Sequence, residues 1–241
     1  MKKLLIAAAL LAGASSTALA ADAIVDIPEA PIAIVDTFTW TGFYVGLHAG
    51  YGFGDTETEY YIGDDAFGNT AGFEPNQDYD IDGFLGGVQV GYNHQINNLV
   101  LGVEADFSFS NIEGESGDIF TTPGQEGGFY TTDVDWFGTV RGRLGFAVDR
   151  TLFYGTGGFA YGQVENSVVD FFEPGAVSED DVSTGWTAGG GVEHAFTDNV
   201  TVKVEYLYID LGDQTISDGG RRSVEFENQF HTVKLGFNYK F

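Results

Sequence analysis

The last stretch of the chain alternates between apolar and polar residues at every second position. In residues 230–241, FHTVKLGFNYKF, one face carries Val233, Leu235, Phe237, Tyr239 and Phe241. The positions between them hold Thr, Lys, Gly and Asn. A period of two is typical of a β-strand whose two faces meet different surroundings. Lipid outside and a wet lumen inside would provide these surroundings, so the pattern predicts a membrane-spanning strand.

The same alternation recurs along the chain and predicts eight strands. They cover residues 40–54, 83–95, 99–110, 134–146, 151–165, 184–196, 200–210 and 230–241. Tight turns are expected at residues 96–98, 148–150 and 197–199, and long polar loops at 55–80, 111–132, 166–183 and 212–227.

The alternation of short and long connections is the layout of an outer-membrane barrel. An even number of strands closes the sheet and removes the open edges that lipid would not tolerate. The sequence therefore predicts an all-β fold, an eight-stranded antiparallel transmembrane β-barrel with short periplasmic turns and long extracellular loops.

The first residues have the pattern of a secretory signal peptide. Met1-Lys2-Lys3 is positively charged, residues 4–11 are apolar, and Ala18-Leu19-Ala20 is a small-x-small cleavage site. We therefore expect a signal peptide in residues 1–20, a periplasmic N-terminal extension in 21–39 and the barrel domain in 40–241.

The composition narrows the functional classes. The formal net charge of −26 argues against nucleic acid as a partner. The chain has no Cys, so it has neither a disulfide nor a thiolate metal site. Abundant Gly (35 residues) and aromatic residues (15%) favour a barrel over a helical domain.

Several stretches resemble one family of membrane barrels. WTGFYVGLHAGYGFG (40–54), GTVRGRLGFAVDRTLFYGTGGFAYG (138–162) and FHTVKLGFNYKF (230–241) are similar to the small OmpA-like barrels of the porin family. The similarity is greatest to the alphaproteobacterial major outer-membrane antigen (RopB-like) type, and it extends over nearly all of the mature chain.

The resemblance implies the outer membrane of a Gram-negative bacterium and a surface protein that helps to keep the envelope intact. It also implies contact with the barrel-assembly machinery through a C-terminal signal. That signal would comprise Val233, Leu235, Phe237, Tyr239 and Phe241.

The inward faces of the predicted strands carry acids and bases in equal number. An eight-stranded barrel is barely wide enough for its own side chains, so charges enclosed in it must pair. One interpretation is a salt-bridged plug; the other is a gate or narrow ion path whose pairs exchange partners. The set is Glu104, Asp106, Arg141, Arg143, Glu193, Lys203, Glu205 and Lys234.

The first predicted loop, residues 55–80, is acidic and contains no basic residue. It is either a solvated, repulsive surface or a weak binder of divalent cations that tie it to outer-leaflet lipid and lipopolysaccharide. Asp78-x-Asp80-x-Asp82 opens like an EF-hand, but its twelfth position is Gln89 in place of a bidentate Glu. We therefore predict no specific metal site.

One set of residues is a candidate for catalysis: His48 with Ser108 or Ser110 and Glu104. The alternation places these side chains inside the lumen, away from a lipid substrate, and the sequence has no nucleophile elbow. The sequence therefore predicts that the protein is no enzyme and uses no cofactor.

These observations predict a structural outer-membrane protein that supports envelope integrity and surface exposure, with ion pairs filling the lumen. Two alternatives stay open: a small porin that passes ions or small solutes, and a surface adhesin or ligand binder acting through the acidic loops. Assembly into a homo-oligomer also stays open.

Overall fold

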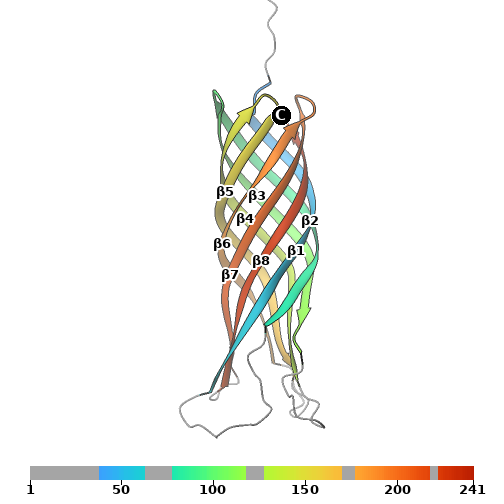
Figure 1. Cartoon of the computed structure of the whole chain (residues 1–241), viewed down its shortest axis with the longest axis vertical. Helices are drawn as coiled ribbons and strands as arrows, with labels where there is room; N and C mark the ends of the chain where they lie inside the picture. Colours follow the sequence, from blue (N-terminus) through green and yellow to red (C-terminus); the bar gives the residue numbers. More distant parts are fainter. Residues whose placement is uncertain (1–37, 63–77, 118–127, 170–176, 218–221) are drawn as a thin grey trace, which may run out of the picture. The chain divides into compact units, whose positions relative to one another are not determined.

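The computed structural model describes residues 38–62, 78–117, 128–169, 177–217 and 222–241. The strands are β1 (Gly42–Ile62), β2 (Asp78–Ile96), β3 (Leu99–Glu115), β4 (Phe129–Val148), β5 (Thr151–Val169), β6 (Val177–Ala195), β7 (Val200–Ser217) and β8 (Arg222–Lys240). Each strand pairs antiparallel with the next, and β8 pairs with β1, which closes the barrel (Figure 1). The predicted fold is confirmed. No helix among the described residues is long and apolar enough to cross a membrane.

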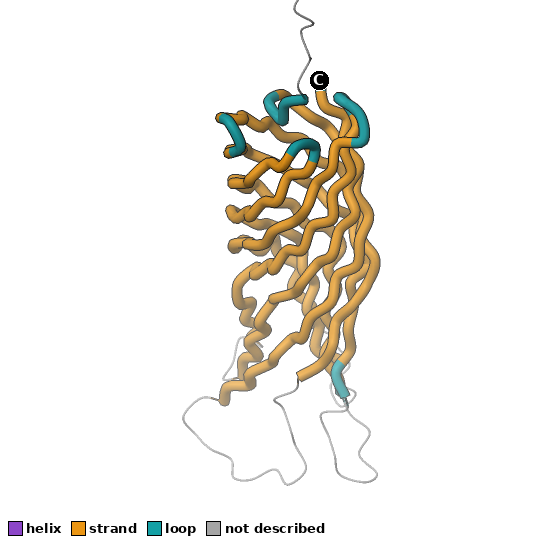
Figure 2. The backbone as a smooth tube through the Cα atoms, turned by 45° about the horizontal axis from the view of Figure 1, so that its top comes forward, coloured by secondary structure: helices purple, strands orange, loops and turns teal. Residues whose placement is uncertain are grey.

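The three tight turns lie at one end of the barrel, together with the C-terminus (Figure 2). Asn97 and Asp149 begin two of them with φ values of 56° and 52°. Asn and Asp adopt this left-handed conformation more readily than other residues with a Cβ. Local turn chemistry thus positions this end of the barrel as the sequence predicted.

At the opposite end the strands run further than predicted. β1 extends to Ile62 and β2 begins at Asp78, so most acidic residues of the predicted first loop are strand residues. Asp, Asn and Gly are poor strand formers, which is why the pattern predicted loops there. Pairing continues nevertheless, with Glu57 opposite both Asp78 and Glu227. The middle of that predicted loop, residues 63–77, lies outside the described residues.

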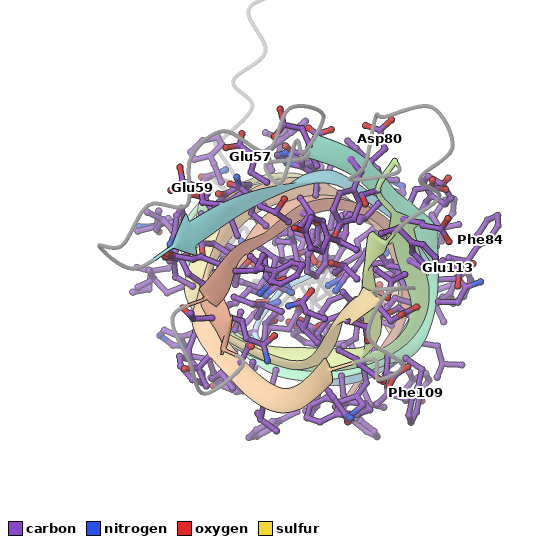
Figure 3. The ribbon with its side chains drawn as sticks, turned by 90° about the horizontal axis from the view of Figure 1, so that it is seen from below. Glu57, Glu59, Asp80, Phe84, Phe109 and Glu113 are labelled. Atoms are coloured by element: carbon purple, nitrogen blue, oxygen red, sulfur yellow. The ribbon has the colours of Figure 1, made fainter. Side chains whose placement is uncertain are left out.

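The two faces of the strands differ as the alternation predicted. Phe84 and Phe109 are 71% and 67% exposed and point away from the barrel (Figure 3). The five residues of the predicted C-terminal signal are all exposed on the outward side of β8 and its end: Val233, Leu235, Phe237, Tyr239 and Phe241. The outward surface is a belt that suits lipid, and aromatic pairs such as Phe107–Trp136 and Trp186–Tyr208 lie on it.

The interior departs from the prediction that ion pairs fill it. Beyond the charged residues, towards the loop end, the inward side chains form a large buried apolar cluster, with hydrogen-bonded polar residues such as Thr132 and Asn166 beside it. We call this part the apolar layer; it includes Ile112, Phe137, Leu207, Ile209, Phe226 and Phe230. A second apolar cluster, around Trp40 and Leu152, lies at the end of the tight turns. Trp40 was predicted as the first strand residue, but it precedes β1 and is buried at 1% exposure.

We expect Phe230→Ala to lower the free energy of unfolding by about 3–5 kcal/mol, because it leaves a cavity in the apolar layer. The matched control is Phe237→Ala on the outward face of the same strand, where lipid refills the space. Equilibrium urea unfolding in lipid vesicles would measure both. Equal losses would contradict a close-packed interior.

Candidate functional site

The eight predicted charged residues meet in one part of the lumen. β3 provides Glu104 and Asp106, β4 provides Arg141 and Arg143, and the remainder come from β6, β7 and β8. None is more than 5% exposed. We call this set the charged network: Glu104, Asp106, Arg141, Arg143, Glu193, Lys203, Glu205 and Lys234.

Glu104 lies at the centre of the charged network. Its carboxylate accepts hydrogen bonds from Arg141 at 2.7 Å and from Lys203 at 2.8 and 2.9 Å. The hydroxyl of Tyr44 also donates to it, at 2.6 Å. Arg141 is its neighbour across the β3–β4 ladder, whereas Lys203 reaches it from β7. Because β3 and β7 are not paired, this contact crosses the lumen.

Asp106 and Glu205 extend the charged network on either side of Arg141. The Arg141 guanidinium donates to Asp106 at 2.9 Å and to Glu205 at 3.0 Å. Lys234 donates to the other oxygen of Asp106 at 3.0 Å, from β8 across the lumen to β3. Arg141 therefore contacts three carboxylates at once, which compensates the cost of burying its charge.

Glu193 and Arg143 form the part nearest the tight turns. Arg143 donates to Glu193 at 2.7 Å, and its guanidinium lies 4.0 Å from the ring centroid of Tyr154. Thr201 and Asn238 donate to the second oxygen of Glu193 at 2.5 and 2.8 Å. Each carboxylate of the charged network is thus multiply hydrogen-bonded.

Neutral residues of the network were missed by reasoning from charge alone. The Tyr44 hydroxyl accepts a hydrogen bond from Arg143 at 2.7 Å and donates one to Glu104, so it bridges the two charged side chains. Tyr154 donates to Glu205 at 2.9 Å, and Gln89 donates to Asn238 at 2.5 Å. The signal that could have found them is a polar or phenolic residue at an inward position of the alternation.

Glycines in the lumen make room for this network. A Cβ at Gly91 or Gly191 would collide with the phenol of Tyr44 or Tyr154, and one at Gly236 would lie 2.8 Å from the Lys203 side chain. These three glycines therefore leave the space that specific large side chains of the lumen occupy.

Two of the candidate catalytic residues, His48 and Ser108, contact each other, but in an enclosed place. His48 Nε2 lies 2.8 Å from Ser108 Oγ, and both side chains are buried. No described carboxylate orients the ring, since His48 Nδ1 has no hydrogen-bond partner among the described residues. Ser110 instead donates to the backbone carbonyl of Val134, and Glu104 belongs to the charged network. This arrangement lacks the access and orientation that acyl transfer needs.

Carboxylates surround the outside of the barrel beyond the apolar belt, at the end opposite the tight turns. Figure 3 shows Glu57, Glu59, Asp80 and Glu113 on this rim. No Lys or Arg side chain described by the structure joins them, and no three of the described acidic, His or Cys side chains are grouped to hold a metal ion. We call this set the carboxyl collar: Asp55, Glu57, Glu59, Asp78, Asp80, Asp82, Glu113, Glu115, Asp133, Asp135, Glu165, Asp210, Asp213, Glu225 and Glu227.

Like charges of the collar face each other across the ladders. Asp55 is opposite Asp80, and Glu57 is opposite Glu227. A hydrogen bond shared with the Asp55 carboxyl raises the pKa of Asp80. Partial desolvation and repulsion from Glu57 raise the pKa of Glu227. Opposed like charges weaken a strand pair, so the collar opposes the pairing of these strand ends at neutral pH.

Comparisons with known proteins agree with this geometry. The family model for the outer membrane protein beta-barrel domain matches residues 6–241. The "31 kDa outer-membrane immunogenic protein" of Brucella melitensis is 42% identical, over 99% of this chain and 100% of the relative. The "22 kDa outer membrane protein" of Rhizobium leguminosarum is 33% identical, over 88% of this chain and 82% of the relative. The outer membrane protein OprG from Pseudomonas aeruginosa shares the fold with a TM-score of 0.51, at 12% identity, over 85% of this chain and 98% of that chain.

We expect Glu104→Gln to cost about 3–5 kcal/mol in the free energy of unfolding, because it leaves buried cations short of a partner. The control is Asp198→Asn, which breaks the exposed pair of Arg150 and Asp198 (2.5 Å) and should cost at most about 1 kcal/mol. Urea unfolding of both variants in lipid vesicles measures the difference. Similar losses would mean that the charged network contributes no more than a surface pair.

The raised pKa values of Asp80 and Glu227 predict that the stability of strand pairing at the carboxyl collar depends on pH. A carboxyl with a raised pKa holds its proton more tightly in the folded state. Its stabilising contribution is complete below the ordinary carboxyl pKa of about 4 and is lost as the pH rises through the raised value.

Hydrogen exchange, corrected for the intrinsic pH dependence, should therefore show the loop-side ends of β1 and β8 better protected near pH 4 than at neutral pH. The variant carrying both Asp80→Asn and Glu227→Gln should reduce this dependence. Protection that rises with pH would contradict the prediction.

Proposed function

Because the chain belongs to the outer membrane protein beta-barrel domain family, we propose that it is a structural protein of the outer membrane whose lumen is closed to ions and solutes. The protein lies in the outer membrane of a Gram-negative bacterium, as do the relatives that it matches over nearly their whole length. In this role the barrel anchors a surface-exposed rim in the membrane and supports the integrity of the envelope.

The observation that carries the proposal is the sequence of layers along the lumen. On β4 the inward residues run from Arg143 and Arg141 through Thr139 to Phe137, and all four are buried. On β8 the same order runs from Lys234 through Thr232 to Phe230. An ion crossing the barrel would have to break the charged network and then enter the apolar layer without its hydration shell. Both steps are costly, and they occur in series.

The surface-exposed part of the proposed role rests on the relatives and the carboxyl collar. The Brucella relative is named as an immunogenic outer-membrane protein, which suits a protein with a rim outside the cell. We propose that the outward belt contacts lipid, that the collar stands at the level of the lipopolysaccharide phosphates, and that the outward face of β8 is what the assembly machinery recognises. Divalent cations would be needed to join collar and phosphates, since both are anionic.

We further propose that the protein has no enzymatic activity. The relatives from Brucella and Rhizobium are named as outer-membrane proteins and not as enzymes. The one Ser–His contact considered for catalysis, Ser108 with His48, lies in the closed lumen.

The test is single-channel conductance of the refolded mature chain in a planar bilayer. We expect no discrete steps in the parent, and none in Arg141→Ala, because the apolar layer still blocks the lumen of that variant. Folding of each protein is verified by its circular dichroism and heat-modifiable migration. Discrete steps in the parent would favour the alternative of a small porin.

A further inference from the structure

Four residues before β1 cross the lumen at the end of the tight turns. Trp40 belongs to a buried apolar cluster with side chains of four strands, Val100 of β3, Ala147 of β4, Leu152 of β5 and Ala195 of β6. The chain then continues into β1, whose own neighbours are β2 and β8. The segment therefore reaches from the strand it precedes to the opposite wall of the barrel.

Polar contacts fix the backbone of this segment on the side of β1. The backbone N–H of Trp40 donates to Gln95 Oε1 at 2.7 Å, and the backbone N–H of Gln95 donates to Thr41 Oγ1 at 2.9 Å. Lys240, the last residue of β8, donates to the carbonyl of Thr39. The backbone is thus attached to both neighbours of β1.

The ring of Phe38 connects the backbone that is bonded to β2 and β8 with the turn between β4 and β5 on the opposite side of the barrel. It lies edge-on to Trp40, with ring centroids 5.1 Å apart. Lys240 lies 4.9 Å from its centroid, and the guanidinium of Arg150, in the turn between β4 and β5, lies 5.0 Å from it. One aromatic ring therefore contacts cations from two separate parts of the mouth.

We propose that residues 38–41 form a latch, a lid over the periplasmic end of the lumen that ties the β1–β8 seam to the opposite wall. It extends the proposed function, because it assigns closure of this end to an element separate from the charged network and the apolar layer. The latch holds through aromatic packing, two cations and a few backbone hydrogen bonds, and not through a strand ladder.

The indole of Trp40 favours a releasable lid. Trp40 is 1% exposed, and its Nε1 donor has no hydrogen-bond partner among the residues that the structure describes. An unpaired buried donor disfavours the closed position, and water would satisfy it on opening. Trp40 is therefore held less firmly than a fully bonded indole would be.

The absence of Cys from the chain allows a direct test with single introduced thiols. Asn93→Cys places a thiol at an inward, buried position opposite Gly42, between the latch and the charged network. Thr232→Cys places one beyond the charged network, next to Lys234 on β8. Within the described part of the chain, neither the Asn93 side-chain carbonyl nor the Thr232 hydroxyl makes a hydrogen bond, so each substitution loses little.

The measurement is the rate at which a water-soluble maleimide labels each thiol in the barrel held in lipid nanodiscs. We expect slow labelling of Asn93→Cys in the parent background and a rate roughly tenfold higher or more when Trp40→Ala is added. Trp40→Phe, which keeps the packing, should leave the rate slow. Thr232→Cys should stay slow in every background.

Two results would overturn the latch: unchanged labelling of Asn93→Cys when Trp40→Ala is added to a folded barrel, or an equal acceleration at Thr232→Cys. The second result would make Trp40 an ordinary core residue whose loss loosens the whole barrel. Should Trp40→Ala not fold, the pair Phe38→Ala and Lys240→Gln loosens the same latch and must give the same acceleration.

Conductance of the same variants separates the two proposals. Loss of the latch should leave the barrel silent, because the charged network and the apolar layer remain. Discrete conductance steps in the parent would contradict the proposal of a closed lumen, and they would not affect the interpretation of the labelling rates. Unchanged labelling with no steps would end the latch alone.

Discussion

The constraint on which this structure depends is that its buried charges must satisfy one another. Eight strands enclose a space that their own side chains fill. Glu104 shows the consequence, because it accepts from Tyr44, Arg141 and Lys203, which come from three different strands. Such contacts join strands on opposite sides of the lumen. The charged network therefore helps to hold the cross-section of the barrel, in addition to neutralising the buried charges.

Charge balance inside the lumen determines where the rest of the charge lies. The charged network contains four acids and four bases and sums to zero, so the whole formal charge of −26 belongs to the remainder of the chain. In the described residues much of it stands in the carboxyl collar, directly beyond the apolar belt. The protein thus combines a neutral interior, an apolar waist and an anionic rim, and each of these suits the medium next to it.

The alternation of residues predicted the faces of the strands and the tight turns, but it did not predict partners or strand length. Register places Glu193 opposite Lys203, yet Arg143 contacts Glu193 and Lys203 contacts Glu104. These choices depend on distances across the lumen, which a pattern along one strand does not contain. Strand length was underestimated because pairing within a closed barrel outweighs the poor strand propensity of residues such as Asp55.

The apolar layer could have been predicted from the same alternation. Phe226 and Phe230 lie on the inward face of β8, the same face as Lys234, and both are buried. The expectation of a wet, polar lumen assigned these positions to loops or left them without a role. Trp40 was harder to predict, because its inward position depends on contacts of its segment with Phe38, Gln95 and Lys240 together. The alternation of residues along one strand contains no information on such contacts.

The layers also bear on whether the charged network works as a gate. Exchange of partners would require Arg141 to leave some of its three carboxylates, and each one left behind would be a buried charge with fewer donors. A displaced guanidinium would need solvation elsewhere in the lumen. On the loop side it would meet Phe137 and Phe230, which offer it no oxygen acceptor, and on the turn side the cluster around Trp40. A charged layer with an apolar cluster on either side therefore favours one arrangement of pairs, and this supports the proposal of a closed lumen over that of a gate.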